Sequence, residues 1–315
     1  MTHAATEASF DAVERYRGEL TAYCYRMLGS PFDAEDAVQE TLVRAWRNLD
    51  AFEGRSALRS WLYRIATNVC LDALQASKRR ARPMDLGPAG EPVLENLNVP
   101  TEVTWIEPMP DPADAAAGRE SVRLALVAAL QRLPPKQRAA LILCEVLRWQ
   151  ASEAAELLET SVASVNSALQ RARATLEAAD VELQPPAPLD ADGRALLDRY
   201  VAAFERYDMD SLTALIRDDA RQSMPPYDLW LEGRDDIFTW WFGPGIGCKG
   251  SRLVAAGTAN GSPAFGQYKP SADGGYAPWA LQVVELRGDR IGELTFFLDT
   301  ERLFPLFGLP PRLDG

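Results

Sequence analysis

Apolar residues recur every three or four positions through much of the N-terminal half of the chain, a spacing that predicts amphipathic helices. One helix is expected within residues 33–49, and its buried side consists of Val38, Leu42, Ala45 and Leu49. A second is expected within residues 57–82, and its buried side consists of Leu62, Ile65, Ala66, Val69 and Ala73. Residues 133–177 predict three or four shorter helices joined by turns. The N-terminal half is therefore expected to be all-α.

Past residue 190 the pattern changes from helical to alternating. Residues 190–216 predict two helices, and residues 233–243 predict a short third one. The alternating, strand-like runs cover residues 251–259, 263–270, 276–286 and 290–298. The sequence "RGDR" favours a tight hairpin turn between the last two runs. This order predicts an α+β domain in which helices cover one face of a strongly bent antiparallel sheet.

The charge of the chain is unevenly distributed. The sequence has 33 Lys and Arg against 45 Asp and Glu, a formal charge of −12. The acidity lies in residues 81–120, with 2 basic and 8 acidic groups, and in residues 184–315, with 13 and 19. Phosphate attraction acts over a Debye length of about 10 Å, so the neutral helical blocks can still bind nucleic acid through local basic clusters.

Residues 81–118 are acidic and rich in proline, which predicts an extended linker. Trp105 and Ile106 make part of it too apolar for a spacer, so we expect them to dock on a folded domain. The single histidine and four scattered cysteines exclude Ser-His-Asp and Cys-His catalysis and offer no zinc spacing. No metal and no cofactor are expected. No apolar run is long enough to cross a bilayer and no signal peptide is evident, which indicates a cytoplasmic location.

The polar sides of the two long helices offer candidate binding surfaces. Asp36, Gln39, Glu40 and Arg44 share one side of the first helix, as a docking surface or as an ordinary solvated face. The second helix lines up a flat aromatic, an amide and cations: Trp61, Arg64, Asn68, Asp72, Gln75 and Arg79. Such a surface suits single or melted strands, because base stacking is worth about 1–3 kcal/mol per base. The alternative is a core tryptophan and a helix C-terminal charge cluster.

Residues 151–177 have the pattern of a helix-turn-helix. We expect Ser152 to cap the first helix and Val162, Val165, Leu169, Ala172 and Leu176 to pack the second. The outward residues are Ala163, Ser164, Asn166, Ser167, Gln170, Arg171 and Arg173. In a helix-turn-helix the second helix enters the major groove, where Asn and Gln contact adenine and Arg contacts guanine. An ordinary helical hairpin is the alternative.

Three stretches resemble bacterial sigma factors of the extracytoplasmic function (ECF) type. They are "DAEDAVQETLVRAWRNL", "FEGRSALRSWLYRIATNVCLD" and "LPPKQRAALILCEVLRWQASEAAELLETSVASVNSALQRARATL". The resemblance implies a subunit that binds core RNA polymerase and directs it to promoters. Family members often have Gly where this chain has Glu159. If that position needs a positive φ, the non-glycine residue costs about 1 kcal/mol.

The resemblance also assigns roles to the candidate residues. It implies polymerase binding by Asp36, Gln39, Glu40 and Arg44. It implies opening of the −10 element, with capture of a flipped base, by Arg55, Trp61, Arg64, Asn68, Asp72, Arg79 and Arg80. It implies recognition of the −35 element by Ala163, Ser164, Asn166, Ser167, Gln170, Arg171 and Arg173.

The C-terminal block resembles the cone-shaped SnoaL-like fold, which encloses a pocket. Candidate lining residues are Tyr227, Trp230, Trp240, Trp241, Tyr268, Trp279 and Phe296, unless these are simply core aromatics. Some relatives of this fold are isomerases or cyclases with an Asp general acid or base. Asp228, Asp235, Asp236 and Asp299 could be offered, but no spacing singles one out and no partner histidine exists.

The expected organisation is multidomain, with two all-α sigma domains and a C-terminal α+β SnoaL-like domain. The expected ranges are region two at 8–82, a linker at 83–118, region four at 119–183, a linker at 184–193 and the SnoaL-like domain at 194–310. The expected function is transcription initiation modulated in cis by the C-terminal domain, without enzymatic activity. Expected partners are core RNA polymerase, promoter DNA and a small ligand or protein regulator, with no membrane. The alternatives are an isomerase or cyclase fused to a DNA-binding module, and a repressor that uses the helix-turn-helix alone.

Overall fold

The chain divides into two compact units. A computed structural model describes residues 11–49, 57–76, 78–111, 123–178 and 189–314. The first unit takes residues 1–80, 106–108 and 124–184, and the second takes residues 81–105, 109–123 and 185–315. Most of the linker is therefore part of the same compact unit as the C-terminal domain.

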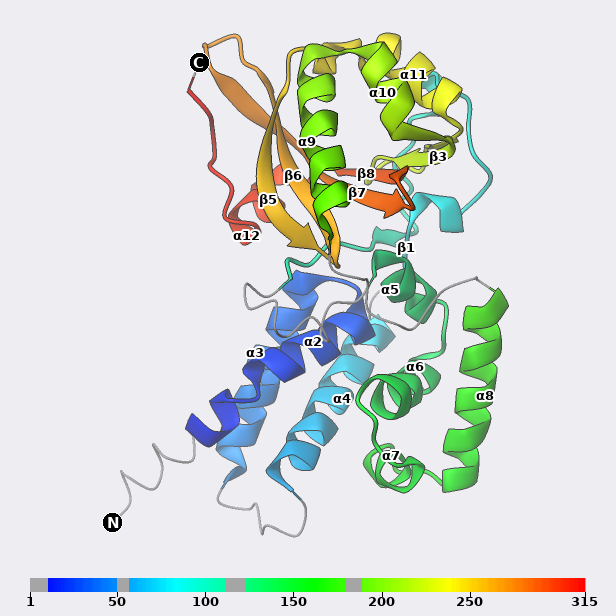
Figure 1. The fold of residues 1–315 in the computed structure, drawn as a ribbon. Coiled ribbons are helices and arrows are strands. Elements are labelled where there is room, and N and C mark those ends of the chain that lie inside the picture. The colour runs from blue at the N-terminus through cyan, green and yellow to red at the C-terminus, as the bar shows by residue number, and fades with distance from the viewer. Residues whose placement is uncertain (1–10, 50–56, 77, 112–122, 179–188, 315) are drawn as a thin grey trace. The chain divides into compact units, whose positions relative to one another are not determined.

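The first unit is built from two helical blocks (Figure 1). The first helical block contains α2 (Arg17–Leu28), α3 (Pro31–Arg47) and α4 (Leu58–Ala76). The second helical block contains α5 (Leu124–Gln131), α6 (Pro135–Leu141), the π-helical turn η5 (Ile142–Val146), α7 (Ala151–Leu157) and α8 (Val162–Ala178). In the described part of the chain, no helix combines the length and apolar character needed to cross a bilayer. The all-α class predicted for this half is confirmed.

The buried side of α4 is rotated from the one predicted. Leu62, Ala66 and Val69 are buried as predicted, but Ala73 is exposed. The fully buried ring of Tyr63 replaces it in the core and lies edge-on to Tyr23, with centroids 5.1 Å apart. The rotation leaves the opposite side of α4 open to solvent.

The two helical blocks pack against each other at the C-terminal end of α2. Arg138 of α6 is 4% exposed and donates to the Met27 carbonyl oxygen and to Gln131 Oε1. The Gln131 amide in turn donates to the Arg26 carbonyl oxygen at 3.3 Å. Burial lowers the pKa of Arg138 to about 10, so its guanidinium is still charged at neutral pH. The second block thus satisfies carbonyl groups that the end of α2 leaves without intrahelical partners.

The second unit contains the predicted α+β domain (Figure 1). Its described helices are α9 (Ala191–Arg206), α10 (Met209–Leu215), α11 (Arg234–Phe242), the 3₁₀ turn η6 (Pro244–Cys248) and α12 (Thr300–Leu306). Its described strands are β3 (Ile216–Ser223), β4 (Trp230–Glu232), β5 (Arg252–Ala259), β6 (Ser262–Pro270), β7 (Tyr276–Arg287) and β8 (Arg290–Phe297). They form one sheet in the order β4-β3-β8-β7-β6-β5, antiparallel except for the β3–β8 pair.

Helix α9 packs across one face of this sheet (Figure 1). Tyr200 is fully buried in the core and donates its hydroxyl to Gln282 Oε1 of β7 at 2.9 Å. Helix α12, which the sequence pattern did not predict, packs elsewhere on the domain, with the ring of Phe304 5.1 Å from that of Tyr268. The expectation of helices over a single face was therefore incomplete.

The linker is mostly extended, as predicted. Strand β1 (Arg80–Ala81) directly precedes it, and its short elements are η2 (Pro83–Asp85), η3 (Leu94–Asn96) and β2 (Thr104–Trp105). Backbone hydrogen bonds of 2.9 Å join the Gly90 amide to the Trp230 carbonyl oxygen and the Asp228 amide to the Asn98 carbonyl oxygen. The indole of Trp230 also donates to the Gly87 carbonyl oxygen at 2.9 Å. The linker is therefore attached to the β4 edge of the domain.

A second attachment holds the end of the described linker. Met109 and Asn260 exchange hydrogen bonds at 3.0 Å, and the Asp111 amide donates to the Thr258 carbonyl oxygen at 3.0 Å. Between the two attachments, Ile106 is 2% exposed and belongs to the first unit. Of the two residues expected to dock on a folded domain, Ile106 is buried, whereas Trp105, at the end of β2, is half-buried.

Candidate functional site

The polar side of α3 carries the four residues expected to bind polymerase. Asp36, Gln39 and Glu40 are exposed, and Arg44 is half-buried. The Arg44 guanidinium pairs with Glu40 Oε1 at 2.7 Å and lies 3.7 Å from Asp72 Oδ2 of α4. Arg44 therefore links this surface to the helix expected to open the −10 element.

Sequence reasoning missed two apolar side chains on the same helix. Trp46 is 56% exposed and Val43 is 40% exposed. An exposed tryptophan is a common anchor of protein–protein interfaces. The signal was present in the sequence, because both residues fall outside the predicted stripe that includes Leu42 and Ala45.

An open hollow of about 410 Å³ lies between α3 and α4 and is lined by Arg44, Asn48, Trp61, Ile65 and Asn68. Ile65 had been expected in the buried stripe, and the rotation of α4 brings it to this surface. Asn68 is exposed, and Trp61 is half-buried. The hollow combines an indole, two amides and a guanidinium, groups that can stack on and hydrogen-bond an unstacked base.

Arg64 and Arg80 make ion pairs inside the first unit. Arg64 Nη2 lies 3.1 Å from Glu156 Oε1 of α7, a largely exposed pair that joins the two helical blocks. Arg80 Nη2 lies 2.6 Å from Asp33 Oδ2, and its side chain is only 15% exposed. Arg80 therefore contributes to the packing of the first unit.

Arg79 is exposed and lines a second open hollow, of about 570 Å³, together with Lys78, Arg80 and Arg132. This basic hollow includes side chains from both helical blocks. Its charge suits phosphate groups. Arg55, the remaining residue expected at the −10 element, lies outside the described residues.

Helix α8 presents the expected outward side. All seven residues assigned to the −35 element are exposed: Ala163, Ser164, Asn166, Ser167, Gln170, Arg171 and Arg173. Arg173 is paired with Glu145 of η5. Val162 differs from its expected place in the stripe, since it is 44% exposed at the start of the helix.

The turn before α8 contains the positive φ that the sequence comparison suggested for Glu159. Glu159 has a φ of +52°, the left-handed conformation that favours glycine. The start of α7 differs from expectation, because its N-cap is Gln150 instead of Ser152. The Gln150 amide donates to Glu153 Oε2 at 2.8 Å, which completes a capping box.

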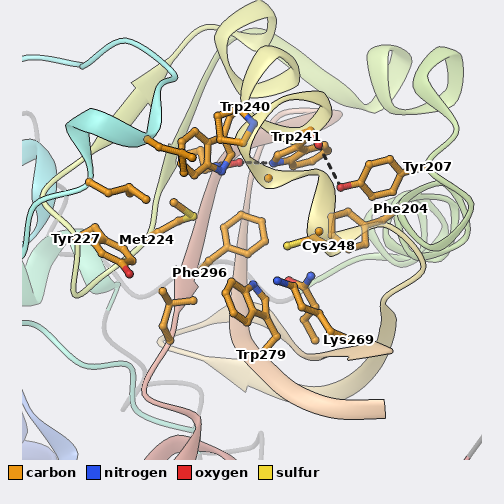
Figure 2. Close-up of a pocket in the computed structure, with 18 residues that line it drawn as sticks. Phe204, Tyr207, Met224, Tyr227, Trp240, Trp241, Cys248, Lys269, Trp279 and Phe296 are labelled. Carbon is orange, nitrogen blue, oxygen red and sulfur yellow. Dashed lines mark hydrogen bonds between the residues drawn. The ribbon is translucent and has the colours of Figure 1, made fainter. Parts of the chain in front are cut away.

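The C-terminal domain contains a cavity of about 180 Å³. Five of the seven candidate aromatics line it: Tyr227, Trp240, Trp241, Trp279 and Phe296. Figure 2 shows Trp240 and Trp241 on one side and Trp279 on the other, with Phe296 between them in this view. The walls are therefore mainly aromatic.

Two other aromatics lie outside this cavity. Tyr268 alternates along β6 with Gln267 and Lys269, which line the cavity, so its ring points to the other face of the sheet and packs on Phe304. Trp230 holds the linker through its indole nitrogen, as described above. Period-two alternation identifies the two faces of a strand, but it does not say which face borders a cavity.

The cavity has few polar groups. Gln222 Oε1 accepts from the Trp241 indole at 2.7 Å, and Lys269 Nζ lies 3.2 Å from the ring centroid of Trp279. Burial raises the pKa of the Cys248 thiol, which keeps it protonated at neutral pH. Among the described residues, the lining includes no carboxylate and no histidine. The four aspartates offered as general acids, Asp228, Asp235, Asp236 and Asp299, all lie outside it.

Comparison with known proteins agrees with both helical blocks. Residues 12–80 match the family Sigma-70 region 2, and residues 123–176 match Sigma-70, region 4. The ECF RNA polymerase sigma factor SigG of Mycobacterium tuberculosis is 47% identical over 315 residues, covering 95% of this chain and 83% of that protein. SigW of Bacillus subtilis, also an ECF sigma factor, is 31% identical over 170 residues, covering 54% of this chain and 87% of SigW.

The fold extends this similarity to the C-terminal domain. The crystal structure of the Mycobacterium tuberculosis ECF sigma factor SigJ matches with a TM-score of 0.62 at 22% identity, covering 96% of this chain and 99% of that one. The predicted fold class, two all-α sigma domains followed by an α+β domain, is confirmed. On the extent of its identity to SigG, the chain belongs to the ECF RNA polymerase sigma factors, the subunits that bind core RNA polymerase and initiate transcription at promoters.

Proposed function

We propose that this sigma factor is restrained in cis by its own C-terminal domain, which holds the linker between the two DNA-binding regions. The observation that carries the proposal is the double attachment of the linker, at Trp230 and at Asn260. A sigma factor that contacts two separate promoter elements needs freedom between its regions. A linker fixed at two places restricts that freedom.

The packing inside the first unit supports the same proposal. Arg138 buries its guanidinium against the end of α2, and Arg64 is paired with Glu156. Arg64 is one of the residues we assign to the −10 element, so this pairing competes with its contact to DNA. The packed arrangement is thus the restrained state, and polymerase would favour an opened one through higher affinity for it.

The roles proposed for individual surfaces follow from their chemistry. We assign the polar side of α3, with Trp46 at its end, to polymerase. We assign the hollow beside Trp61 and Asn68 to a flipped base of the −10 element, and the exposed side of α8 to the −35 element. We also propose the following domains: region two at 8–82, a linker at 83–118, region four at 119–183, a linker at 184–193 and the SnoaL-like domain at 194–310. We place the protein's action in the cytoplasm, where RNA polymerase works.

An enzymatic role for the C-terminal domain is not favoured. The relatives are named as sigma factors, which are initiation factors and not catalysts. Proton transfer also needs a group with a suitable pKa within hydrogen-bond reach of the substrate. The described lining of the cavity offers a protonated thiol, amides, phenols and one ammonium instead.

The test is run-off transcription with purified core polymerase and the full-length chain. The variant Trp230→Phe removes the indole donor to Gly87 and keeps an aromatic ring at the same place. Asn260→Gly removes the side-chain acceptor and tolerates the positive φ of 55° at that position. We expect the double variant to give several-fold more transcript at limiting sigma concentration, with unchanged thermal unfolding of the first unit.

A matched control is Asp273→Gly, which changes an exposed turn that does not contact the linker. It should behave as the wild type. Equal transcript yield and equal polymerase affinity for the wild type and the double variant would rule out restraint by the linker.

A further inference from the structure

We infer that the cavity of the C-terminal domain binds a small planar aromatic molecule bearing an acceptor oxygen, preferably an anionic one, and that this ligand locks the linker onto the domain. The ligand site stands on the geometry of the cavity alone. Its effect on transcription rests on the restraint in cis proposed above.

The size and walls of the cavity define the body of the ligand. An apolar protein cavity of about 150 Å³ is large enough for benzene. The volume here is about 180 Å³ and the cavity is not closed, so one aromatic ring fits inside and a second fused ring extends towards the opening. Three indoles and the ring of Phe296 face this space (Figure 2), so a flat aromatic molecule gains stacking and edge contacts that an aliphatic one does not.

The polar groups define the ligand's functional group. Gln222 is 1% exposed, and its Oε1 is already used by the Trp241 indole. Gln222 lines the cavity, so its Nε2 is placed to donate a hydrogen bond to a ligand there. Lys269 offers a second donor and a positive charge. Because Lys269 carries a positive charge and the described lining has no carboxylate to balance a second one, an acceptor oxygen or an anion is favoured over a cation.

The linker forms part of the cavity wall. Leu94 and Leu97, at the two ends of the short turn η3, both line it. The segment is held on either side by the bonds of Gly90 to Trp230 and of Asn98 to Asp228. A ligand in the cavity therefore contacts the leucines only while the linker is docked.

Because the ligand contacts the linker only in the docked state, ligand binding and linker docking favour each other. Contacts made only in the docked state increase the population of that state when ligand binds. By reciprocity, a partner that needs the linker free weakens ligand binding by the same factor. The ligand is thus an inhibitor of polymerase binding, and core polymerase displaces it.

The first experiment measures binding to the full-length chain by isothermal titration calorimetry. The probes are 2-naphthoate, 2-naphthol and the cation 2-naphthylmethylammonium. We expect saturable binding with 1:1 stoichiometry for 2-naphthoate, weaker binding for 2-naphthol and none for the cation. Lys269→Met should weaken 2-naphthoate about 10-fold or more and 2-naphthol little, because only the carboxylate loses a charge-assisted hydrogen bond.

Two further variants locate the site. Gln222→Leu should weaken both naphthoate and naphthol, since it removes the buried donor and keeps the volume. Lys249→Met is the matched control, because Lys249 is exposed and does not line the cavity. Absence of saturable binding for every probe, or equal loss in the Lys249 and Lys269 variants, would overturn the site.

The second experiment measures the linker. Hydrogen exchange of the Gly90 and Asp228 amides should slow several-fold when 2-naphthoate is added. In the Leu94→Ser/Leu97→Ser variant the probe should bind more weakly and leave exchange unchanged. Binding without any change in exchange in the wild type would overturn the lock. Binding with slowed exchange but unchanged run-off transcription would leave the lock intact and refute the restraint in cis.

Discussion

Glu285 of β7 and Glu293 of β8 lie directly opposite each other across the β7–β8 strand pair. Burial is the main cause, and repulsion from Glu293 the second, of a rise in the pKa of Glu285 to about 7. The positive charges of Arg82, Arg287 and Arg123 oppose this shift. Arg82, directly before the linker, lies 3.9 Å from Glu293, so the acidic pair is partly balanced by the residue that leads into the docked linker.

The first prediction concerns the pH dependence of stability. A glutamate has its ordinary pKa of 4.5 in the unfolded chain, so between pH 4.5 and about 7 only the folded state keeps the proton of Glu285. The contribution is fully present below pH 4.5 and is lost as pH rises to about 7, with no further change above it. The loss should be about 1–3 kcal/mol.

Urea unfolding of the wild type and of Glu285→Gln between pH 4 and 8 measures this contribution. The difference between the two proteins should change with pH only in the stated window. Glu232→Gln, at an exposed ion pair, serves as the control and should show a flat difference. A flat difference for Glu285→Gln as well would show that this carboxyl titrates normally.

The second prediction concerns the turn between α7 and α8. Glu159→Gly should raise the free energy of unfolding by up to about 1 kcal/mol, because glycine adopts the left-handed conformation without a steric penalty. Ala174→Gly, on the exposed side of α8, should instead lower it by about 1 kcal/mol. Thermal unfolding of both variants checks the signs. If both variants are destabilised, the Glu159 side chain must stabilise the fold by more than its left-handed backbone conformation destabilises it.

The sequence predicts elements well wherever the hydrophobic period is strong. The helices α3, α4, α8 and α9 and the strands β5 to β8 all occur near their expected positions. Strand β3 was missed because "IRDDARQS" is polar and shows no alternation. It forms because it pairs with β4 and β8 on its two edges, a long-range contact that local sequence does not encode.

The candidate sites also differ in whether local periodicity or long-range packing determines them. The outward residues of α8 can be predicted from helical periodicity alone. The left-handed conformation of Glu159 can be predicted from the glycine that family members often have at this position. The cavity cannot, because the places of Trp230 and Tyr268 depend on strand register and on which face the helices cover. The linker's extended form follows from its prolines and charge, but the bond of Met109 to Asn260 joins residues 151 positions apart in the sequence.

The third prediction concerns the ion pair between the helical blocks. The two side chains of Arg64 and Glu156 are 39% and 74% exposed, so breaking the pair should change stability by less than about 1 kcal/mol. Arg64→Gln should reduce transcript yield, since it removes a cation from the −10 surface. Glu156→Gln should raise the yield or leave it unchanged, because it frees that cation. Equal losses in both variants would mean that the pair serves folding and not DNA binding.

The fourth prediction concerns the hollow between α3 and α4. Trp61→Ala and Asn68→Ala should each slow strand opening about 10-fold, because base stacking on an aromatic side chain is worth about 1–3 kcal/mol and the amide adds a hydrogen bond. Trp61→Phe should retain most of the rate, since a ring remains available. Permanganate reactivity of unpaired thymines in a promoter complex measures the opening.

Trp46→Ala is the contrasting variant, because this exposed indole lies on the surface assigned to polymerase. It should weaken binding to core enzyme and leave the opening rate of the assembled complex unchanged. If Trp61→Ala and Asn68→Ala instead open the promoter at the wild-type rate, the hollow has no role in holding a flipped base.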